Sequence, residues 1–304
     1  MEEKISVILV NYNGLKYNDA CIASILKSAG CGRLQIVVVD NASTDGSYEQ
    51  LQAHWGENEQ VLLLQAGENY GFAKGNNLGI RRALEENPDY IMLLNNDTVI
   101  EPDAIAQMVR LQKEKGGIIT PKIKYADRPD VVWSAGGKFS KVLKKSRHIG
   151  LNKTDGAEFD KDRQCGFTTG CCFLMSRPVF EQMGYLDERF FLYYEDNEYS
   201  FRARSRQVTI WYCHSAVVYH KVNGATLGNE KAVNAYYIAR NWLICARQYL
   251  GAEYGLFLFY FILNRLVWMG LWSLQGRKDM VKATKEAVHD YRHGITGAYQ
   301  ERRK

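Results

Sequence analysis

Short apolar runs alternate with amphipathic segments over the first hundred residues of the chain. Four runs are rich in Val, Ile and Leu and end in turn-forming residues; they lie at 5–10, 34–39, 61–64 and 90–94. Runs of this length are typical of strands buried in a sheet. The segments between them, such as 15–29, place apolar residues at helical spacing. This alternation predicts a parallel sheet with helices on both faces and right-handed connections.

The pattern continues less regularly to residue 250. Further strands are predicted at 118–123, 131–133 and 167–175, followed by a strand pair at 208–212 and 216–219. Helices are predicted at 177–184, from about 195, and at 230–250. The whole pattern predicts an α/β fold, with a mixed, mostly parallel sheet flanked by helices and a C-terminal helical extension.

Polar clusters follow the four strands of the first half. They are Asn11-Tyr12-Asn13, Asp40-Asn41, Asn69-Tyr70-Gly71 and Asn95-Asn96-Asp97, and Asn76 lies on the helix that opens after the third. The carboxyl ends of parallel strands share one edge, where open α/β sheets bind ligands. A nucleotide diphosphate needs an aromatic face, an acceptor for a base N–H and a cation, which Tyr12, Asp40 and Asp97 would supply. The alternative is a row of ordinary turns, since Asn and Asp favour turns.

Composition and missing motifs narrow the function classes. The chain is 46% apolar and 24% charged, as in ordinary globular proteins, and its formal net charge of +5 permits an anionic partner. We expect no nucleic-acid partner. Seven scattered cysteines and the absence of a secretory signal favour a reducing cytoplasm. The first strand is followed by neither a Gly-x-Gly-x-x-Gly nor a P-loop motif, so dinucleotide and P-loop sites are not expected.

A second chemical cluster lies at residues 186–202. Glu195 and Asp196 are surrounded there by aromatic residues, which would desolvate a carboxylate and raise its pKa toward that of a general base. Such a base suits the activation of an acceptor hydroxyl. The alternative is that the two acids only stabilise the N-terminus of the following helix.

The order of these motifs resembles family 2 glycosyltransferases of the GT-A fold, and within them the bacterial rhamnosyltransferase-like branch. The matching pieces are Val10-Asn11-Tyr12-Asn13, Val39-Asp40-Asn41-Ala42-Ser43-Thr44-Asp45, Asn69-Tyr70-Gly71-Phe72-Ala73, Leu94-Asn95-Asn96-Asp97, Thr169-Gly170-Cys171-Cys172-Phe173, Phe191-Leu192-Tyr193-Tyr194-Glu195-Asp196 and Arg240-Asn241. The resemblance implies inverting transfer of a sugar, rhamnose being favoured, from a nucleoside diphosphate to a hydroxyl of a glycan or polyprenyl-linked glycan. The donor would be dTDP-rhamnose or, as an alternative, a UDP-sugar, and the product would serve polysaccharide biosynthesis in the cell envelope.

The resemblance also implies roles for individual residues. Asp97 would hold Mg²⁺ or Mn²⁺, and Asp196, beside Glu195, would be the catalytic base. Tyr12 would stack near the base and Asp40 accept from its N–H, while Arg240 would face the diphosphate or the acceptor. The other expected donor-site residues are Asn11, Asn13, Asn41, Asn69, Gly71, Asn76 and Asn96.

One departure from the family pattern concerns the metal. The Asp-x-Asp signature is replaced by Asn95-Asn96-Asp97, so a single carboxylate remains. A lone carboxylate should bind the cation more weakly, which favours a further protein ligand. His220, at the end of a predicted strand, matches a ligand of metal-dependent relatives and is the expected partner.

We expect a catalytic domain at 1–225, with a nucleotide-binding half (1–115) and an acceptor-binding half (116–225), and a helical, aromatic-rich extension at 226–304. The basic run 138–147 is interpreted as a solvated face, or alternatively as a phosphate-facing loop or flap. Residues 279–304 should form a charged, exposed helix and tail.

The apolar stretch 254–272 is interrupted by Arg265, which disfavours a simple membrane span. It is interpreted as an interfacial or hairpin-like membrane contact at the inner face of the cell membrane, with Tyr260, Trp268 and Trp272 at headgroup depth. Basic residues would face anionic lipid; they are Arg277, Lys278, Lys282 and Lys285. The alternative is a helical pair buried on the catalytic domain or in a homodimer.

Two other functions remain open from the sequence. A sugar nucleotidyltransferase usually carries a Gly-rich, basic loop after the first strand, which Asn11-Tyr12-Asn13-Gly14 does not provide. A non-catalytic sugar-nucleotide-binding protein would have no use for the Glu195-Asp196 pair.

Overall fold

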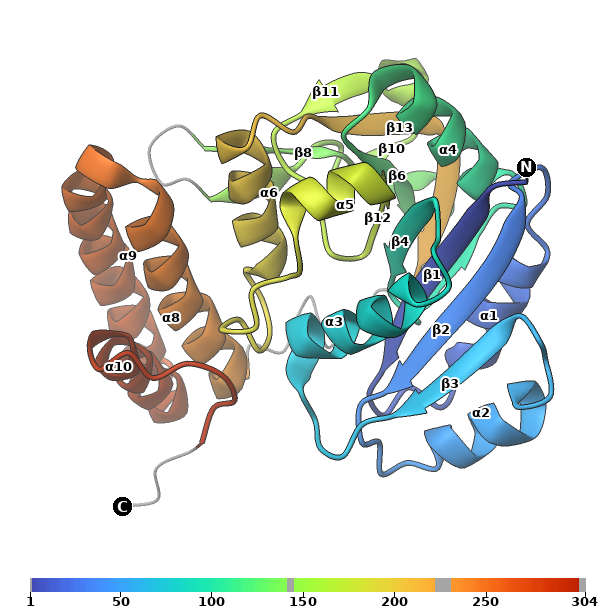
Figure 1. Cartoon of the computed structure of the whole chain (residues 1–304). Coiled ribbons are helices and arrows are strands. Elements are labelled where there is room, and N and C mark those ends of the chain that lie inside the picture. The colour runs from blue at the N-terminus through green and yellow to red at the C-terminus, as the bar shows by residue number, and fades with distance from the viewer. Residues whose placement is uncertain (1, 141–144, 222–230, 301–304) are drawn as a thin grey trace.

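A single mixed sheet organises the molecule (Figure 1). The computed structural model describes residues 2–140, 145–221 and 231–300. In that part of the chain eleven strands form the sheet: β1 (Lys4–Asn11), β2 (Arg33–Asp40), β3 (Val61–Gln65), β4 (Tyr90–Leu94), β5 (Thr98–Ile100), β6 (Ile118–Tyr125), β7 (Val131–Ala135), β10 (Lys153–Thr154), β11 (Arg163–Cys165), β12 (Cys172–Ser176) and β13 (Ile210–His220). A separate hairpin pairs β8 (Gly137–Phe139) with β9 (Ser146–His148).

Helices flank this sheet and continue beyond it. They are α1 (Asn18–Leu26), α2 (Ser47–Trp55), α3 (Gly71–Leu84), α4 (Ala104–Lys115), α5 (Arg177–Met183), α6 (Glu195–Ser205), α8 (Ala232–Tyr249), α9 (Tyr254–Leu274) and α10 (Lys278–Arg292), with short 3-10 turns at Ala157–Phe159 and Gly251–Glu253. The α/β fold with a C-terminal helical extension is confirmed.

The sheet changes direction at β4. Strands β3, β2, β1 and β4 run parallel in that order, as the alternating pattern predicted. On the other side of β4, strand β12 runs antiparallel and continues to β6. The parallel half of the sheet therefore ends at β4. Because β12 is antiparallel to β4, the residues that precede β12 lie at the same edge of the sheet as the residues that follow β4.

Alternation along β1 divides the core between the two faces of the sheet. Val7 and Leu9 pack with residues of α1 and α4, whereas Ile8 packs with residues of α3, α5 and α6. Successive side chains of a strand point to opposite faces, so an apolar run without polar breaks must be covered on both sides. This explains why the strands lack the polar-out pattern of a half-exposed sheet.

Three helices at the C-terminus form a group beside α6, on the side of the molecule away from β3 (Figure 1). Their shared core is aromatic. Trp242 of α8 packs edge-on against Phe257 and Phe261 of α9, and the same cluster includes Phe190 and Tyr194 from the segment before α6. The extension is thus packed onto the part of the chain that carries Glu195 and Asp196.

Two details of the predicted fold are wrong. The expected strand pair at 208–219 is one long strand, β13, whose register with β6 shifts between Cys213 and Val217. The polar residues in that interval belong to a bulge, which sequence alone does not distinguish from a turn. Helix α10 is not fully exposed, because Met280, Ala283 and Ala287 are buried in the helical group.

Helix α9 is continuous, so the hairpin interpretation of 254–272 is also wrong. Among the described residues one helix, Gly251–Leu274, is long and apolar enough to cross a membrane by length and composition, and only 17% of its most apolar window is buried. Trp272 is buried against Ala235 and Met280, so it does not stand at headgroup depth as expected.

Candidate active site

A network of buried amides joins the polar clusters at the carboxyl edge of the parallel strands. Asn11 ends β1 opposite Asp40 of β2, and its side chain is fully buried. The Asn11 Nδ2 donates to Asp40 Oδ1 (2.7 Å) and to Ser43 Oγ (3.0 Å). Its Oδ1 accepts from the amides of Asn18 (3.0 Å) and Asn96 (2.9 Å). One side chain therefore connects the loops after β1, β2 and β4.

These contacts use much of the hydrogen-bonding capacity of the predicted donor-site residues. Asn96 Nδ2 donates to the side-chain oxygens of Asn11 and Asn18, so this amide points into the network. Asp40 is only 1% exposed, and its second oxygen accepts from the Ser43 N–H (3.0 Å). Asn11, Asp40 and Asn96 thus order the edge of the sheet, and Asn18 is a member that the sequence analysis missed.

Tyr12 and Asn13 lie at the open side of this edge. The ring of Tyr12 is 51% exposed, which leaves an aromatic face available at the ends of the parallel strands. Asn13 adopts a left-handed backbone (φ 53°), and its Oδ1 accepts from the Thr44 N–H (2.8 Å). The loop that presents Tyr12 is therefore fastened to the loop after β2.

The third cluster is fastened to the second half of the protein. Asn41 Nδ2 donates to Asn69 Oδ1 and to the Gly71 carbonyl, both at 3.0 Å. Gly71 has a positive φ of 73°, and a Cβ there would lie 2.3 Å from the Phe191 carbonyl oxygen, so only glycine fits. The next residue, Phe72, donates its N–H to that same carbonyl (2.7 Å).

Asn76 lies one turn into α3. Its side-chain amide donates to the Phe72 carbonyl (2.9 Å), and the residue is 2% exposed. The side chain of Asn76 is therefore buried and bonded to the backbone of its own helix, α3.

The two expected metal ligands lie side by side. His220 ends β13 opposite Thr98 of β5, and its Nε2 is 3.2 Å from Asp97 Oδ1. Asp97 Oδ1 and His220 Nδ1 are both buried, and neither has a hydrogen-bond partner in the described part of the chain. Burial opposes protonation of His220, but the neighbouring Cys171 and Asp97 outweigh it and raise the pKa of the imidazole.

The raised pKa of His220 describes the pair without a metal, because a metal-bound imidazole must be neutral. A carboxylate oxygen and an imidazole nitrogen that face each other fit a divalent cation such as Mn²⁺ or Mg²⁺, which would take the place of that proton. Within the described residues no group of three His, Cys, Asp or Glu side chains could hold a metal. A cation held by Asp97 and His220 would therefore take its remaining ligands from diphosphate oxygens and water.

The start of β12 brings the two halves of the site together. The Asn95 N–H donates to the Cys171 carbonyl (2.8 Å), which holds residues 170–171 beside Asp97. The preceding N–H, that of Gly170, donates to Asp196 Oδ2 (3.2 Å). A Cβ at Gly170 would be 3.2 Å from the Phe72 ring, so this glycine allows a close approach between β12 and α3.

Glu195 and Asp196 lie in the first turn of α6, where Glu195 is buried and Asp196 is partly exposed. Burial, together with the charge of Asp196, raises the pKa of Glu195 to about 8. Burial likewise raises the pKa of Asp196, although hydrogen bonds from Gly170 and Asn197 oppose the shift. Glu195 Oε2 finds no hydrogen-bond partner among the described residues. The desolvation expected from the aromatic surroundings is therefore present.

Arg240 lies on α8 and is fully buried. Its Nη1 donates to the Tyr236 hydroxyl (3.1 Å) and its Nε to Asn241 Oδ1 (3.0 Å), while Nη2 has no hydrogen-bond partner within the described ranges. The next residue, Asn241, donates to the carbonyls of Leu192 and Tyr193 just before α6. Arg240-Asn241 was expected from the sequence as a pair, but no role was expected for Asn241. The available signal for it was an amide among the mostly apolar buried residues of this helix.

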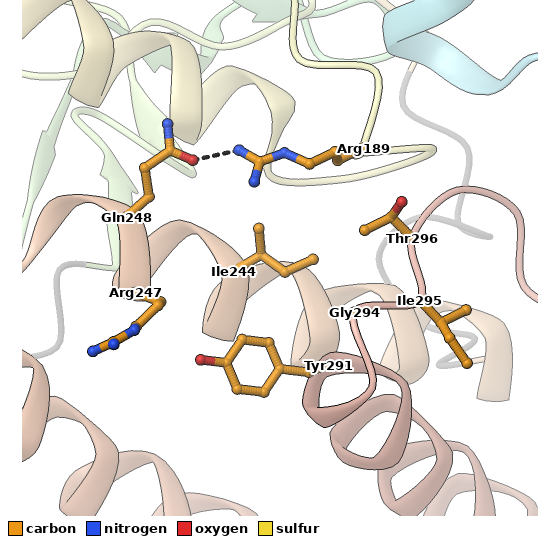
Figure 2. A pocket seen from close by; sticks show the side chains of 8 residues that line it. All are labelled: Arg189, Ile244, Arg247, Gln248, Tyr291, Gly294, Ile295 and Thr296. Carbon is orange, nitrogen blue, oxygen red and sulfur yellow. Dashed lines mark hydrogen bonds between the residues drawn. The ribbon is translucent and has the colours of Figure 1, made fainter.

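A separate cavity of about 610 Å³ lies between α8, the end of α10 and the segment before α6 (Figure 2). It is lined by Arg189, Ile244, Arg247, Gln248, Tyr291, Gly294, Ile295 and Thr296. The predicted site residues, all within the described ranges, lie outside this lining. Figure 2 shows the Arg189 guanidinium directed at Gln248, and the same guanidinium is paired with Asp187.

A parallel sheet with a polar carboxyl edge, joined to a second half that supplies a buried acid, is the arrangement of GT-A glycosyltransferases. The fold resembles that of GalNAc-T7 solved with UDP, GalNAc and Mn²⁺ (TM-score 0.64, 15% identity), over 81% of this chain and 48% of that protein. This chain thus spans about half of that larger protein.

Comparison of its sequence with known proteins shows to which family the chain belongs. The pattern of Glycosyl transferase family 2 matches residues 6–184, which is more than half of the chain, and the protein belongs to that family. It is 31% identical to the low-salt glycan biosynthesis hexosyltransferase Agl10 of Haloferax volcanii, over 79% of this chain and 75% of that protein. It is 25% identical to the dTDP-rhamnosyl transferase RfbF of Shigella flexneri, over 82% and 81%.

A third relative is the N-acetylglucosaminyl-diphospho-decaprenol L-rhamnosyltransferase of Mycobacterium tuberculosis, at 24% identity over 73% of this chain and 78% of that protein. The chain is therefore a glycosyltransferase with rhamnosyltransferase-like relatives. The two alternatives considered from the sequence, a sugar nucleotidyltransferase and a non-catalytic binding protein, are set aside.

The raised pKa of Glu195 predicts a pH-dependent cost in stability. The folded protein binds this proton more tightly than the unfolded chain, so the free energy of unfolding should fall as pH rises from about 4.5 to about 8. Glu195→Gln cannot ionise, so its free energy of unfolding should not fall in this way as the pH rises. We expect the variant to match the wild type near pH 4 and to exceed it by roughly 1–3 kcal/mol at pH 8 in urea unfolding. Exposed Glu57→Gln should differ little at either pH, and a pH-independent difference for Glu195→Gln would contradict the assignment.

Proposed function

We propose that this protein transfers a sugar, with rhamnose as the favoured candidate, from a nucleoside diphosphate to a hydroxyl of a glycan or lipid-linked glycan, with inversion and with the help of Mg²⁺ or Mn²⁺. One observation carries the proposal. Residues 170–171 touch both halves of the site, since Cys171 lies beside His220 and Asn95 while Gly170 donates to Asp196. The names of the Shigella and Mycobacterium relatives support a rhamnosyl donor and a lipid-linked acceptor.

The nucleotide would bind at the edge of β1 and β2. The exposed ring of Tyr12 offers a stacking face for the base. Asp40 accepts one hydrogen bond at each oxygen within the described residues, and an ionised carboxylate has about four acceptor positions. A lone pair therefore remains for a base N–H. The amide network around Asn11 keeps the loops that carry these groups in place.

Asp97 and His220 would hold the cation next to the diphosphate. When bound there, Mg²⁺ or Mn²⁺ supplies Lewis-acid neutralisation of the charge that develops on the leaving diphosphate. The protein contributes a carboxylate and an imidazole whose facing atoms are already 3.2 Å apart. His220 is buried, whereas the Asp97 side chain is 27% exposed, so the carboxylate side of the pair is open to a ligand.

Asp196 would act as the base. The acceptor hydroxyl gives its proton to Asp196 as its oxygen bonds to the anomeric carbon, and the bond from that carbon to the diphosphate oxygen breaks on the opposite face. The raised pKa of Asp196 brings it closer to the working range of a general base. Burial and the charge of Asp196 raise the pKa of Glu195 and so favour its protonated form, and we assign the proton-accepting role to Asp196.

Removal of the base should separate chemistry from binding. Asp196→Asn keeps the shape and the hydrogen bond from Gly170 but cannot take a proton. We expect transfer to fall at least about a hundredfold, as for loss of a general base. Binding of the nucleoside diphosphate, measured by calorimetry, should stay within about threefold of wild type. Turnover that survives this substitution would contradict the assignment.

The metal assignment can be tested without turnover. Asp97→Asn and His220→Ala should each weaken Mn²⁺ binding, measured by electron paramagnetic resonance in the presence of nucleoside diphosphate, by about tenfold or more. His214→Ala serves as the control, because His214 lies on the same strand, β13, but pairs with Asp162 and not with Asp97. Unchanged Mn²⁺ affinity in both site variants would refute this metal site.

We further propose that α9 lies on the surface of an anionic membrane. Its exposed side chains form an apolar face; they include Leu256, Phe259, Ile262, Leu263, Leu266, Val267, Trp268 and Leu271. Arg277 lies three residues after the end of α9, and Lys278 begins α10, so positive charge adjoins the end of the apolar face. An amphipathic surface of this kind suits the lipid interface, where a lipid-linked acceptor would also be found.

Charges placed on this face should abolish membrane binding. Leu266→Glu and Val267→Glu replace side chains that are 59% and 61% exposed, so folding should be preserved. We expect the double variant to lose co-sedimentation with phosphatidylglycerol vesicles, whereas Gln52→Glu/Gln60→Glu, with the same added charge on exposed positions of the other half, should keep it. If the double variant instead converts a dimer to a monomer with unchanged vesicle binding, the face is a homodimer contact and the lipid proposal fails.

A further inference from the structure

The turn immediately before the two acids has an unusual backbone. Tyr193 (φ 64°) and Tyr194 (φ 75°) are both left-handed, although neither is glycine. A non-glycine residue in that region costs of order 1–3 kcal/mol and persists only where its surroundings fix it. Two in succession lead directly into Glu195 and Asp196. The direction in which these carboxylates leave the helix therefore depends on whatever holds this turn.

Asn241 of α8 holds it. Its side-chain Nδ2 donates one hydrogen to the Leu192 carbonyl (2.9 Å) and the other to the Tyr193 carbonyl (2.8 Å). Its Oδ1 accepts from Arg240 Nε (3.0 Å), which fixes the orientation of the amide. Asn241 is fully buried, so water does not substitute for these bonds. Every hydrogen of this amide group is used to fix the turn.

Two other contacts hold the same segment at points further from the acids. The Phe191 carbonyl accepts from the Phe72 N–H at the start of α3. Arg189, at the beginning of the segment, reaches Gln248 on α8 (Figure 2), which lies seven residues, or about two turns, along the helix from Asn241. Gln248 is exposed, and its contact lies four residues before the left-handed pair. Asn241 and Gln248 thus both bind this segment from α8, Asn241 at the turn and Gln248 four residues before it. Substitution of Gln248 is therefore a matched control for substitution of Asn241.

We propose that Asn241 is a positioning residue of the transfer reaction: by fixing the Tyr193-Tyr194 turn from α8, it aims Asp196 at the acceptor hydroxyl. This inference rests on the proposed role of Asp196 as the base. It means that the C-terminal helices complete the active site in addition to any part they take in membrane binding. Asn241 touches no reacting atom and acts through the backbone of the turn.

A positioning role differs in its kinetics from a purely structural one. The groups that our proposal places around the donor (Tyr12, Asp40, Asp97 and His220) have no hydrogen bond with Asn241 among the described residues. Arg240, which was expected from the sequence to face the diphosphate or the acceptor, does donate to Asn241 and belongs to the same α8 contact. Without its two hydrogen bonds the turn can relax toward ordinary backbone angles, which would shift the Asp196 carboxylate away from Gly170. Donor binding should then be kept while the chemical step slows. Water admitted around Asp196 would also lower its pKa, so the acidic limb of the kcat profile should move to lower pH.

The test compares Asn241→Ala with Gln248→Ala and with Asp196→Asn. We expect Asn241→Ala to lower kcat about 10- to 100-fold, in line with a displacement of about 1 Å of a catalytic group. Donor KM should change by no more than about threefold, and the acidic limb should shift to lower pH. Asn241→Ser, which can replace one of the two donated hydrogen bonds, should give an intermediate kcat. Gln248→Ala should leave kcat, KM and the pH profile near wild type.

The proposal is overturned if Asn241→Ala keeps wild-type kcat, if Gln248→Ala loses as much, or if the loss appears only in donor KM. Should Asn241→Ala fail to fold, Asn241→Ser carries the same test with the same criteria. Failure of the base assignment is recognised separately, because Asp196→Asn would then retain turnover whatever Asn241→Ala does.

Discussion

The site depends on one strand pairing, that of β12 with β4. Because the two strands are antiparallel and Cys172 pairs with Leu94, the residues that precede β12 must lie beside those that follow β4. The hydrogen bond from Asn95 to Cys171 extends this pairing by one step. Register in a buried sheet is strongly specified, since a slip of one residue would turn every side chain to the other face. The proposed metal side and the proposed base side are thus joined by the core of the fold.

Burial of Glu195 opposes stability, and packing of the C-terminal helices offsets this cost. A carboxyl group without a partner in an apolar environment costs free energy, as the raised pKa of Glu195 reflects. The aromatic cluster shared by the segment before α6 and by α8 and α9 supplies apolar burial around that place. The division at residue 225 expected from the sequence lies outside the described residues, and it separates two stretches of chain that, in our proposal, build one active site.

The parallel half of the fold was predictable because each strand is a short apolar run closed by Asn or Asp. What those amides do was not predictable in the same way. Asn41 and Asn96 bond to neighbouring protein groups, and a sequence does not show whether an amide faces a ligand or another loop. The Asp97–His220 contact was expected only through family resemblance, because the two residues are 123 positions apart in the chain. The role of Asn241 required the backbone angles of Tyr193 and Tyr194, which no residue pattern indicates.

The most direct measurement is a crystal structure with Mn²⁺ and a nucleoside diphosphate, using anomalous scattering to locate the metal. The account predicts a manganese peak bound by Asp97 and His220 and bridged to the diphosphate. It also predicts the Asp196 carboxylate on the opposite side of the space left for the sugar, with its hydrogen bond from Gly170 intact. A manganese ion bound elsewhere, or an Asp196 side chain turned away from that space, would contradict it.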